Sequence, residues 1–417
     1  MIMKHSLFLK TAGTFVMHAS IILCWVMPAK AQTTYTVTDL GSGATGAFET
    51  TADDINIRGE AVAETIQSLS PGFKTIGFVS KNGQITLLPS LGGQSTFAGA
   101  INASGVVAGS SHLAGDTIIH ATIWDRDLNH ITDLGTLGGS ISAALWLNDR
   151  NQAVGDSVTS NGVDIHGFLW DRGTLVDLGT LGGSTSFPFG INNSGLVIGQ
   201  ADTTTALDPL FGIPTFHGFR WDRGVLRDLG EIFGGHFNYA QSVNERGDIV
   251  GAADLAGDLT AHAFMIRNAS LIDLGVAPGD TNSAAFGVNN RGQVVGISAL
   301  FIDPPPAPPS INFLCPCHAA IWQDGAATDL NTLIPPGSGW QLILAIAIND
   351  RGQIVGNGML NNEFRAFLLT PNNSSSMSSV SDGVMTNQAP AAIGKVEGPS
   401  AIRATIVNGK RRLVLEP

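Results

Sequence analysis

Five histidines recur at equivalent places along the chain, and a ring of histidines could bind a metal ion or transfer protons. Each precedes an Ala or Gly, and they are His120, His166, His217, His262 and His318. Zinc ligand nitrogens lie about 2 Å from the metal, whereas neighbouring sheets pack about 10 Å apart. The pattern therefore favours a structural role, in which each imidazole bonds a nearby backbone group or a repeated aspartate. We predict no metal site and no cofactor.

Repeated aspartates offer a second possible chemistry, because paired carboxylates can act as an acid and a base. They are Asp39, Asp133, Asp177, Asp228, Asp273 and Asp329. Catalytic carboxylates must flank one bond, about 5–10 Å apart. Symmetric copies, mostly in Asp-Leu-Gly, instead predict turn-forming acids that accept from backbone N–H groups. The sequence contains no nucleophile elbow, phosphate loop or zinc-protease helix, and Gly-Gly pairs such as Gly138-Gly139 are interpreted as loops between repeats.

The elements that position these residues are repeats. Their shared pattern is Asp-Leu-Gly, a Gly-rich stretch, Ile-Asn-x-x-Gly-x-Val-Val-Gly and His-Ala/Gly-Phe. The anchoring asparagines are Asn56, Asn102, Asn148, Asn192, Asn244, Asn289 and Asn349. A period of about 40–50 residues, rich in Gly and β-branched residues, is typical of one four-stranded propeller blade. In the third repeat we expect strands at residues 142–147, 152–157, 167–170 and 175–178.

The Asn-x-x-Gly segments predict tight hairpins. The asparagine side chain can bond the backbone two residues on, and Gly supplies a left-handed conformation. The third repeat has Asn151 in place of Gly, and Asn is the residue that best tolerates positive φ after Gly.

The two ends of the repeat region complement one another. The region opens at residues 35–40 with what corresponds to a last strand, and it ends at residues 366–369 with a third strand. The sequence therefore predicts an all-β, seven-bladed β-propeller of four-stranded blades, in which the N-terminal strand completes the last blade and removes exposed edges. A β-helix is the alternative; it needs capped ends rather than such closure.

The chain divides into four parts. Residues 1–31 have a basic start, a short apolar run and Ala29-Lys30-Ala31, which predicts a cleaved signal peptide; an uncleaved anchor is the alternative. Residues 32–371 form the predicted propeller, residues 372–398 a Ser-rich flexible linker, and residues 399–417 a tail with a possible β-hairpin. We expect no transmembrane span after cleavage and a secreted, periplasmic or cell-surface location.

The formal net charge of −12 bears on partners. Removing the signal peptide makes it more negative, and no basic stripe follows, which argues against nucleic acid and anionic membranes. The mature chain keeps Cys315 and Cys317 beside His318. A closed zinc site needs four ligands, so an oxidised pair is favoured over a metal.

The combined pattern resembles the bacterial extracellular HAF repeat family over roughly residues 34–371. The resemblance implies an exported, propeller-like protein and brings no activity, substrate or catalytic residue with it. The chain departs from the pattern at Ile76 and Arg365, which stand at the histidine place, and at Leu87, which stands at the aspartate place.

Function is expected where the repeats differ. Long insertions follow Gly199 and Gly296 and precede Asn349, all on the end of the ring that carries the loops before each His. Aromatic residues that look exposed, with one histidine, collect there and predict a ligand-binding surface; the alternative is that they only pin the loops. They are Phe211, His236, Phe237, Tyr239, Phe313 and Trp340.

The sequence thus favours an exported, non-enzymatic binding module whose ligand is an unknown glycan, peptide or protein, with a carbohydrate or cell-envelope component foremost. A polysaccharide-directed hydrolase or lyase is one alternative, with Glu231, Asp280 and Asp303 as its few unrepeated acids. A purely structural surface protein is another. Fold analogy does not separate these classes.

Overall fold

The computed structural model describes residues 33–69, 72–208, 212–300 and 317–372, and strands at 402–407 and 410–415. Within these residues the protein is an all-β propeller, in which five sheets have four strands, one has eight and one has two. The predicted signal peptide, residues 1–31, and residues 373–398 of the predicted linker lie outside the described residues.

Four of the four-stranded sheets are continuous in sequence, and the strands of each pair in chain order. The first two comprise β2 (Ala47–Ile55), β3 (Ala61–Ser68), β4 (Phe73–Lys81) and β5 (Gln84–Leu87), and then β14 (Ser186–Ile191), β15 (Val197–Leu207), β16 (Pro214–Asp222) and β17 (Val225–Asp228). The other two comprise β18 (Gly234–Val243), β19 (Ile249–Leu255), β20 (Ala261–Arg267) and β21 (Ser270–Gly275), and then β22 (Asn282–Val288), β23 (Val294–Ala299), β24 (Cys317–Gln323) and β25 (Ala326–Asp329).

The eight-stranded sheet consists of two such quartets. They comprise β6 (Gly92–Ile101), β7 (Val107–Leu113), β8 (Ile119–Trp124) and β9 (Ile131–Gly135), and then β10 (Gly138–Leu147), β11 (Ala153–Thr159), β12 (Ile165–Asp171) and β13 (Thr174–Gly179). A single parallel pair, Ile141 with Ile119, joins β10 to β8.

The remaining four-stranded sheet closes the ring. It contains β26 (Trp340–Ile348), β27 (Ile354–Leu360), β28 (Glu363–Pro371) and, at its outer edge, β1 (Tyr35–Asp39). β1 pairs antiparallel with β28, with Val37 opposite Leu369. The predicted closure by the N-terminal strand is therefore confirmed. Tyr35 is buried in this sheet, and burial raises the pKa of its hydroxyl to about 12.

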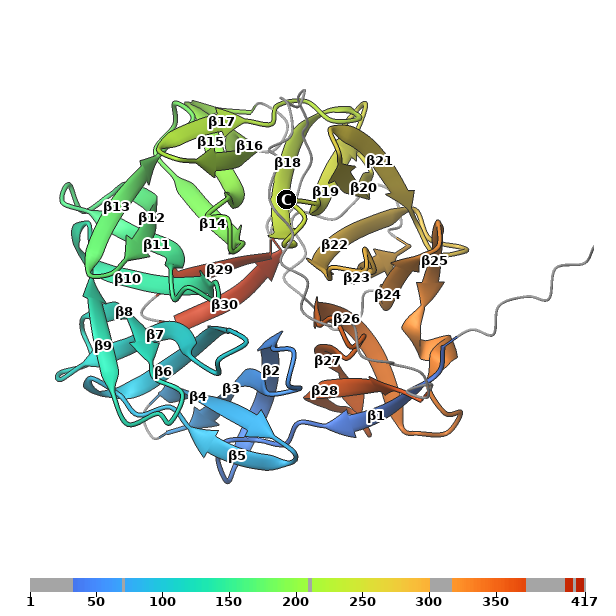
Figure 1. Ribbon diagram of the computed structural model, residues 1–417, viewed down its shortest axis with the longest axis horizontal. Coiled ribbons are helices and arrows are strands. Elements are labelled where there is room, and N and C mark those ends of the chain that lie inside the picture. Colours follow the sequence, from blue (N-terminus) through green and yellow to red (C-terminus); the bar gives the residue numbers. More distant parts are fainter. Residues whose placement is uncertain are drawn as a thin grey trace, which may run out of the picture. The chain divides into compact units, whose positions relative to one another are not determined.

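Within each quartet the first strand lies toward the centre of the ring and the last lies at the rim (Figure 1). Because neighbouring strands are antiparallel, the Asn-x-x-Gly turns and the turns between third and fourth strands lie at one end of the sheets, which we call the turn face. The predicted backbone conformation is confirmed, since Gly105 and Asn151 have φ of +88° and +60°.

The core lies between neighbouring sheets. The Phe of His-Ala/Gly-Phe and its equivalents are fully buried at Phe78, Phe168, Phe219, Phe264 and Phe367. Phe168, for example, packs in a cluster with Ala144 of its own quartet and with Ala100 and Ala108 of the adjoining quartet. Fully burying one such ring stabilises the fold by about 1.5–3 kcal/mol, so this repeated residue is a principal contributor to the packing.

The prediction that Gly-Gly pairs form loops between repeats is wrong for three of them. Gly92-Gly93, Gly138-Gly139 and Gly234-Gly235 begin β6, β10 and β18. A Cβ on Gly139 would meet Val158 of the neighbouring strand β11 at 2.5 to 2.8 Å. The glycines therefore let the inner strand continue close against its partner, across a β-bulge between Gly138 and Ser142.

The three insertions differ in structure. The one after Gly199 lengthens β15 and β16, which pair again at Leu207 and Pro214, while the one after Gly296 includes residues 301–316, outside the described residues. The third contains the 3₁₀ helix η1 (Leu330–Leu333), which buries Leu330 and Leu333 in the core. This third insertion therefore serves packing.

The tail contains β29 (Ile402–Val407) and β30 (Lys410–Leu415), which pair antiparallel. In the part of the chain that the structure describes, no helix has the length and hydrophobicity needed to cross a membrane.

Candidate functional site

The repeated asparagines form a closed circle of hydrogen bonds on the turn face. Asn148 Nδ2 donates to the carbonyl oxygen of Asn192 at 3.0 Å. The same bond links each asparagine to the next, until Asn349 donates to the carbonyl oxygen of Asn56 at 2.9 Å. Oδ1 of Asn148 also accepts from the backbone N–H groups of Arg150 and Gln152. One side chain thus closes its own turn and ties neighbouring sheets together.

The residue after the asparagine contributes to a second circle, in which each side chain reaches back to the preceding sheet instead of forward to the next. Its side chain accepts from the backbone N–H of the equivalent residue in the preceding sheet, as Asp149 does from Ala103 at 2.8 Å. Asn193, Glu245, Asn290 and Asp350 repeat the arrangement. Ile57 and Ala103 occupy this place in the β2–β5 sheet and the β6–β9 quartet, and their apolar side chains cannot accept. The symmetry of the turn face is therefore broken at these two neighbours.

The repeated histidines lie near the opposite end of the sheets, beside the repeated aspartates. Nδ1 is 2.8 Å from a carboxylate oxygen in His120–Asp133, His166–Asp177 and His217–Asp228, and 3.0 Å in His262–Asp273. Each of these carboxylates also accepts from the backbone N–H two residues on. This geometry links the third strand of a sheet to the end of its fourth strand.

His318 is the exception among these histidines. Its Nδ1 and Nε2 each lie 3.8 Å from a carboxylate oxygen, of Asp329 and Asp280 respectively. The neighbouring Cys317 is disulfide-bonded, and the other cysteines, Cys24 and Cys315, lie outside the described residues. Among the described residues, His, Cys, Asp and Glu form no group of three or more that could hold a metal ion.

The aromatic surface expected from the sequence is not present as such. Phe237 and Tyr239 were expected to be exposed, but they are fully buried. They lie at alternate positions of the inner strand β18, whose side chains contact neighbouring sheets, and burial raises the pKa of Tyr239. Phe237 packs on Phe216 with ring centroids 5.2 Å apart. Neither ring can stack on a ligand without leaving the core.

The other residues of that predicted surface do not gather into one site. Phe211 and Phe313 lie outside the described residues. Trp340 is half-buried and packs edge-on against Phe367, so it serves at least partly to cover the core. His236 is exposed, and its Nδ1 lies 2.6 Å from Asp258. Of the acids considered for catalysis, Glu231 is exposed, Asp280 is half-buried with its side chain largely covered beside His318, and Asp303 lies outside the described residues.

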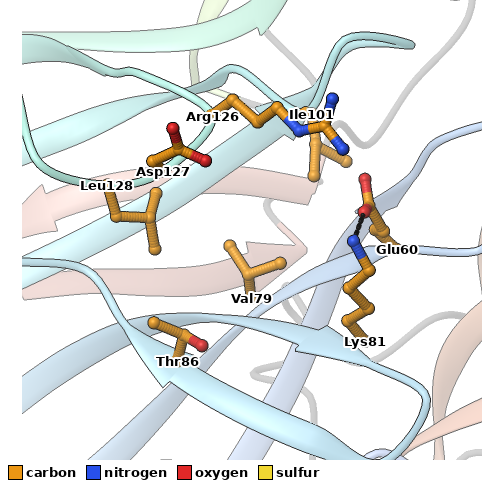
Figure 2. A pocket seen from close by; sticks show the side chains of 9 residues that line it. Glu60, Val79, Lys81, Thr86, Ile101, Arg126, Asp127 and Leu128 are labelled. Atoms are coloured by element: carbon orange, nitrogen blue, oxygen red, sulfur yellow. Dashed lines mark ion pairs between the residues drawn. The ribbon is translucent and has the colours of Figure 1, made fainter.

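A cavity on the turn face is lined by the same two groups of strands that carry Ile57 and Ala103. It has a volume of about 240 Å³ and lies between the β2–β5 sheet and the β6–β9 quartet. Its lining residues are Glu60, Val79, Lys81, Thr86, Ile101, Gly105, Arg126, Asp127 and Leu128. Figure 2 shows the Arg126, Lys81 and Glu60 side chains near one another, with Val79, Leu128 and Thr86 on the other side of the view. We call it the turn-face cavity.

One carboxylate of this cavity, Glu60, is buried. Its Oε2 accepts from Asn56 Nδ2 at 2.7 Å and from Arg58 Nε at 2.9 Å, and its Oε1 lies 2.6 Å from Lys81 Nζ. Although burial alone would raise it, these donors together lower the pKa of Glu60 to about 2. Glu60 is therefore ionised at neutral pH, with both oxygens engaged.

The sequence did not predict this cavity, because the long insertions lie on the opposite end of the sheets and the cavity lies on the turn face. A signal was available. The third-to-fourth-strand turn that starts at Trp124 runs through Asp125-Arg126-Asp127-Leu128-Asn129-His130, and is longer than the Trp170-Asp171-Arg172-Gly173 turn. The same part of the chain carries Ile57 and Ala103 where other repeats have polar residues.

Comparison with known proteins shows the fold. No protein-family model matches the chain, and no curated protein matches it. The β-propeller domain of the Trilobed protease from Pyrococcus furiosus, described as having an open velcro topology, is 10% identical with a TM-score of 0.53, over 80% of this chain and 100% of that chain. Oligogalacturonate lyase from Vibrio parahaemolyticus is 8% identical with a TM-score of 0.50, over 82% and 98%. At such low identity these likenesses establish a β-propeller and nothing about activity.

Proposed function

We propose that the chain is an exported seven-bladed propeller of the HAF repeat type that acts as a non-enzymatic binding module. The blade count is supported by the single residue pair that joins the two quartets of the eight-stranded sheet. If each quartet is counted as one blade, the two quartets and the five four-stranded sheets make seven blades, one for each repeated asparagine. Signal-peptide cleavage after Ala31 and a secreted, periplasmic or cell-surface location are part of this proposal. Amino-terminal sequencing of the exported protein tests it, with Gln32 expected first.

The binding function rests on one observation, the coincidence of three departures from the repeat at one junction. The second circle is interrupted at Ile57 and Ala103, the turn after Trp124 is lengthened, and the turn-face cavity lies between the same two groups of strands. Symmetric residues hold the ring together, so a site that binds one ligand is favoured where the symmetry is broken. The proposed ligand is a carbohydrate or another component of the cell envelope.

A cavity-filling substitution tests this function. Thr86 is exposed on β5 and opposite Val79, and Val176 is exposed at the equivalent position of β13, opposite Leu169. Thr86→Trp places a large ring over the cavity, whereas Val176→Trp makes the same change where no such cavity is proposed. We expect Thr86→Trp to abolish sedimentation of the protein with isolated bacterial cell-envelope polysaccharide, and Val176→Trp to leave it unchanged. Equal binding by both variants would refute the proposal.

A polysaccharide hydrolase or lyase is the second candidate, favoured by the position of His318 between Asp280 and Asp329. An imidazole between two carboxylates can exchange a proton with a bound substrate. The test is cleavage of the same polysaccharide. Cleavage that is lost in His318→Gln but kept in Thr86→Trp would establish this candidate instead of the first.

A further inference from the structure

We propose that the turn-face cavity recognises the carboxylate of an acidic sugar, and that Arg126 selects this sugar over its neutral counterpart. The inference rests on the proposed binding function and names the chemical class of its ligand. It starts from a difference between Arg126 and its equivalents in other turns. Arg172 Nε lies 3.8 Å from Asp171, and Arg223 Nε lies 3.7 Å from Asp222, so each has the preceding aspartate as a partner.

Arg126 has lost that partner to the lengthened turn. Oδ1 of Asp125 accepts from the backbone N–H groups of Asn129 and His130, at 2.8 and 3.2 Å. Its Oδ2 lies 2.9 Å from His130 Nδ1. These bonds, led by the one from the His130 backbone, lower the pKa of Asp125. Within the described residues, the Arg126 guanidinium takes part in no hydrogen bond or ion pair, and it is exposed beside the cavity.

The carboxylates of the cavity leave this cation available. Glu60 is saturated by Asn56, Arg58 and Lys81, so a ligand cation would find little capacity on it. Lys81 is more than half exposed, and an ammonium has three donors, so it can also donate to a ligand. A planar guanidinium with an ammonium nearby is an arrangement that suits a carboxylate.

The remaining lining suits the body of one sugar residue. Val79, Ile101 and Leu128 supply apolar contact, and Thr86 and Asp127 supply a hydroxyl and a carboxylate for sugar hydroxyl groups. Leu128 has φ of +58°, an uncommon conformation for a residue with a side chain. Its side chain is partly buried against the hydrophobic cluster that includes Val107 and Trp124. The volume of about 240 Å³ lies below the usual range for ligand pockets, which favours one residue of a longer chain over a whole oligosaccharide.

Isothermal titration with trigalacturonate and with the neutral trigalactose obtained by reducing its carboxyl groups tests the inference. We expect the unmodified protein to bind the acidic sugar about 10- to 100-fold more tightly, the range typical of a charged hydrogen-bonded pair. Arg126→Gln should lower that ratio several-fold without weakening trigalactose binding, and the part that remains is due to Lys81. Arg172→Gln, the same change in a turn without the cavity, should keep the ratio of the unmodified protein.

Other outcomes separate this inference from the binding function on which it rests. If the Thr86→Trp variant loses envelope binding but Arg126→Gln keeps the acid-to-neutral ratio, the binding function stands and the role of Arg126 is wrong. If an acidic peptide displaces the polysaccharide and trigalacturonate does not, the ligand is a protein and the sugar class is wrong. If Thr86→Trp binds like the unmodified protein, both proposals fail together.

Discussion

Replacing one asparagine of the circle should destabilise the whole ring. Asn148 is buried and makes four hydrogen bonds: two from Nδ2, to the Asn192 carbonyl and to Gln152 Oε1, and two to Oδ1 from the Arg150 and Gln152 backbones. Each bond contributes about 1 kcal/mol net. Arg150 is exposed, so water can replace the bond that its backbone N–H loses in the variant. We therefore expect Asn148→Ala to lower the free energy of unfolding by about 2–3 kcal/mol.

The corresponding change in melting temperature is small because the domain is large. With an unfolding entropy of about 2.1 cal/mol/K per residue over about 340 residues, a loss of 2–3 kcal/mol corresponds to about 3–4 °C. Denaturant unfolding followed by tryptophan fluorescence measures the free energy, and calorimetry measures the temperature. Asn129→Ala is the control, because Asn129 is exposed and its side chain makes no hydrogen bond within the described residues. A difference between the two variants below about 0.5 kcal/mol, the usual limit for surface substitutions, would refute the reasoning.

Three further predictions concern other repeated features and the cavity. His166→Ala should lower stability by about 1 kcal/mol or less, because the pair with Asp177 is partly exposed, and should leave metal content by mass spectrometry unchanged; loss of a stoichiometric metal would overturn the structural role. Glu60 should make the free energy of unfolding depend on pH in acid. Between its ordinary pKa of 4.5 and its folded-state pKa of about 2, Glu60 is protonated in the unfolded chain but ionised in the folded protein. As the pH decreases through that window, the free energy of unfolding should therefore decrease by up to about 1.4 kcal/mol per pH unit. Unfolding titrations should show a shallower fall in Glu60→Gln, and equal slopes would contradict the assignment. Gly155→Ala should prevent folding to a soluble protein, because its Cβ would overlap the Ala143 carbonyl oxygen. Gly173→Ala has open space around its Cβ and should cost only about 1–2 kcal/mol through its positive φ. Soluble expression and circular dichroism distinguish the two.

Much of the fold was predictable because its determinants are local and repeated. The Asn-x-x-Gly turns, the buried Phe that follows His166, His217 and His262, and the unmatched strand at residues 35–40 each depend on neighbours in sequence or on the repeat itself. The Gly-Gly pairs were misassigned because Gly is equally compatible with a loop and with a strand that approaches its partner closely. Only the contact between β10 and β11 decides between them.

The candidate site was less predictable for a related reason. Sequence indicates that Phe237 and Tyr239 belong to a strand, but it does not say which sheets flank that strand, and these sheets bury both rings. The turn-face cavity likewise depends on residues of two groups of strands, with Glu60 and Lys81 on one side and Arg126 on the other. Each residue alone looks like an ordinary surface charge.

The sequence by itself determined the repeat, the all-β class and the closure of the ring by β1, because hydrogen-bonding turns and alternating burial are written into short segments. The tertiary structure decided which polar groups remain available. The asparagines and most of the repeated histidines and acids bond one another or the backbone. Among the described residues Arg126 has no such partner, because the lengthened turn engages Asp125. That availability is a property of three-dimensional neighbours, and no spacing along the chain encodes it.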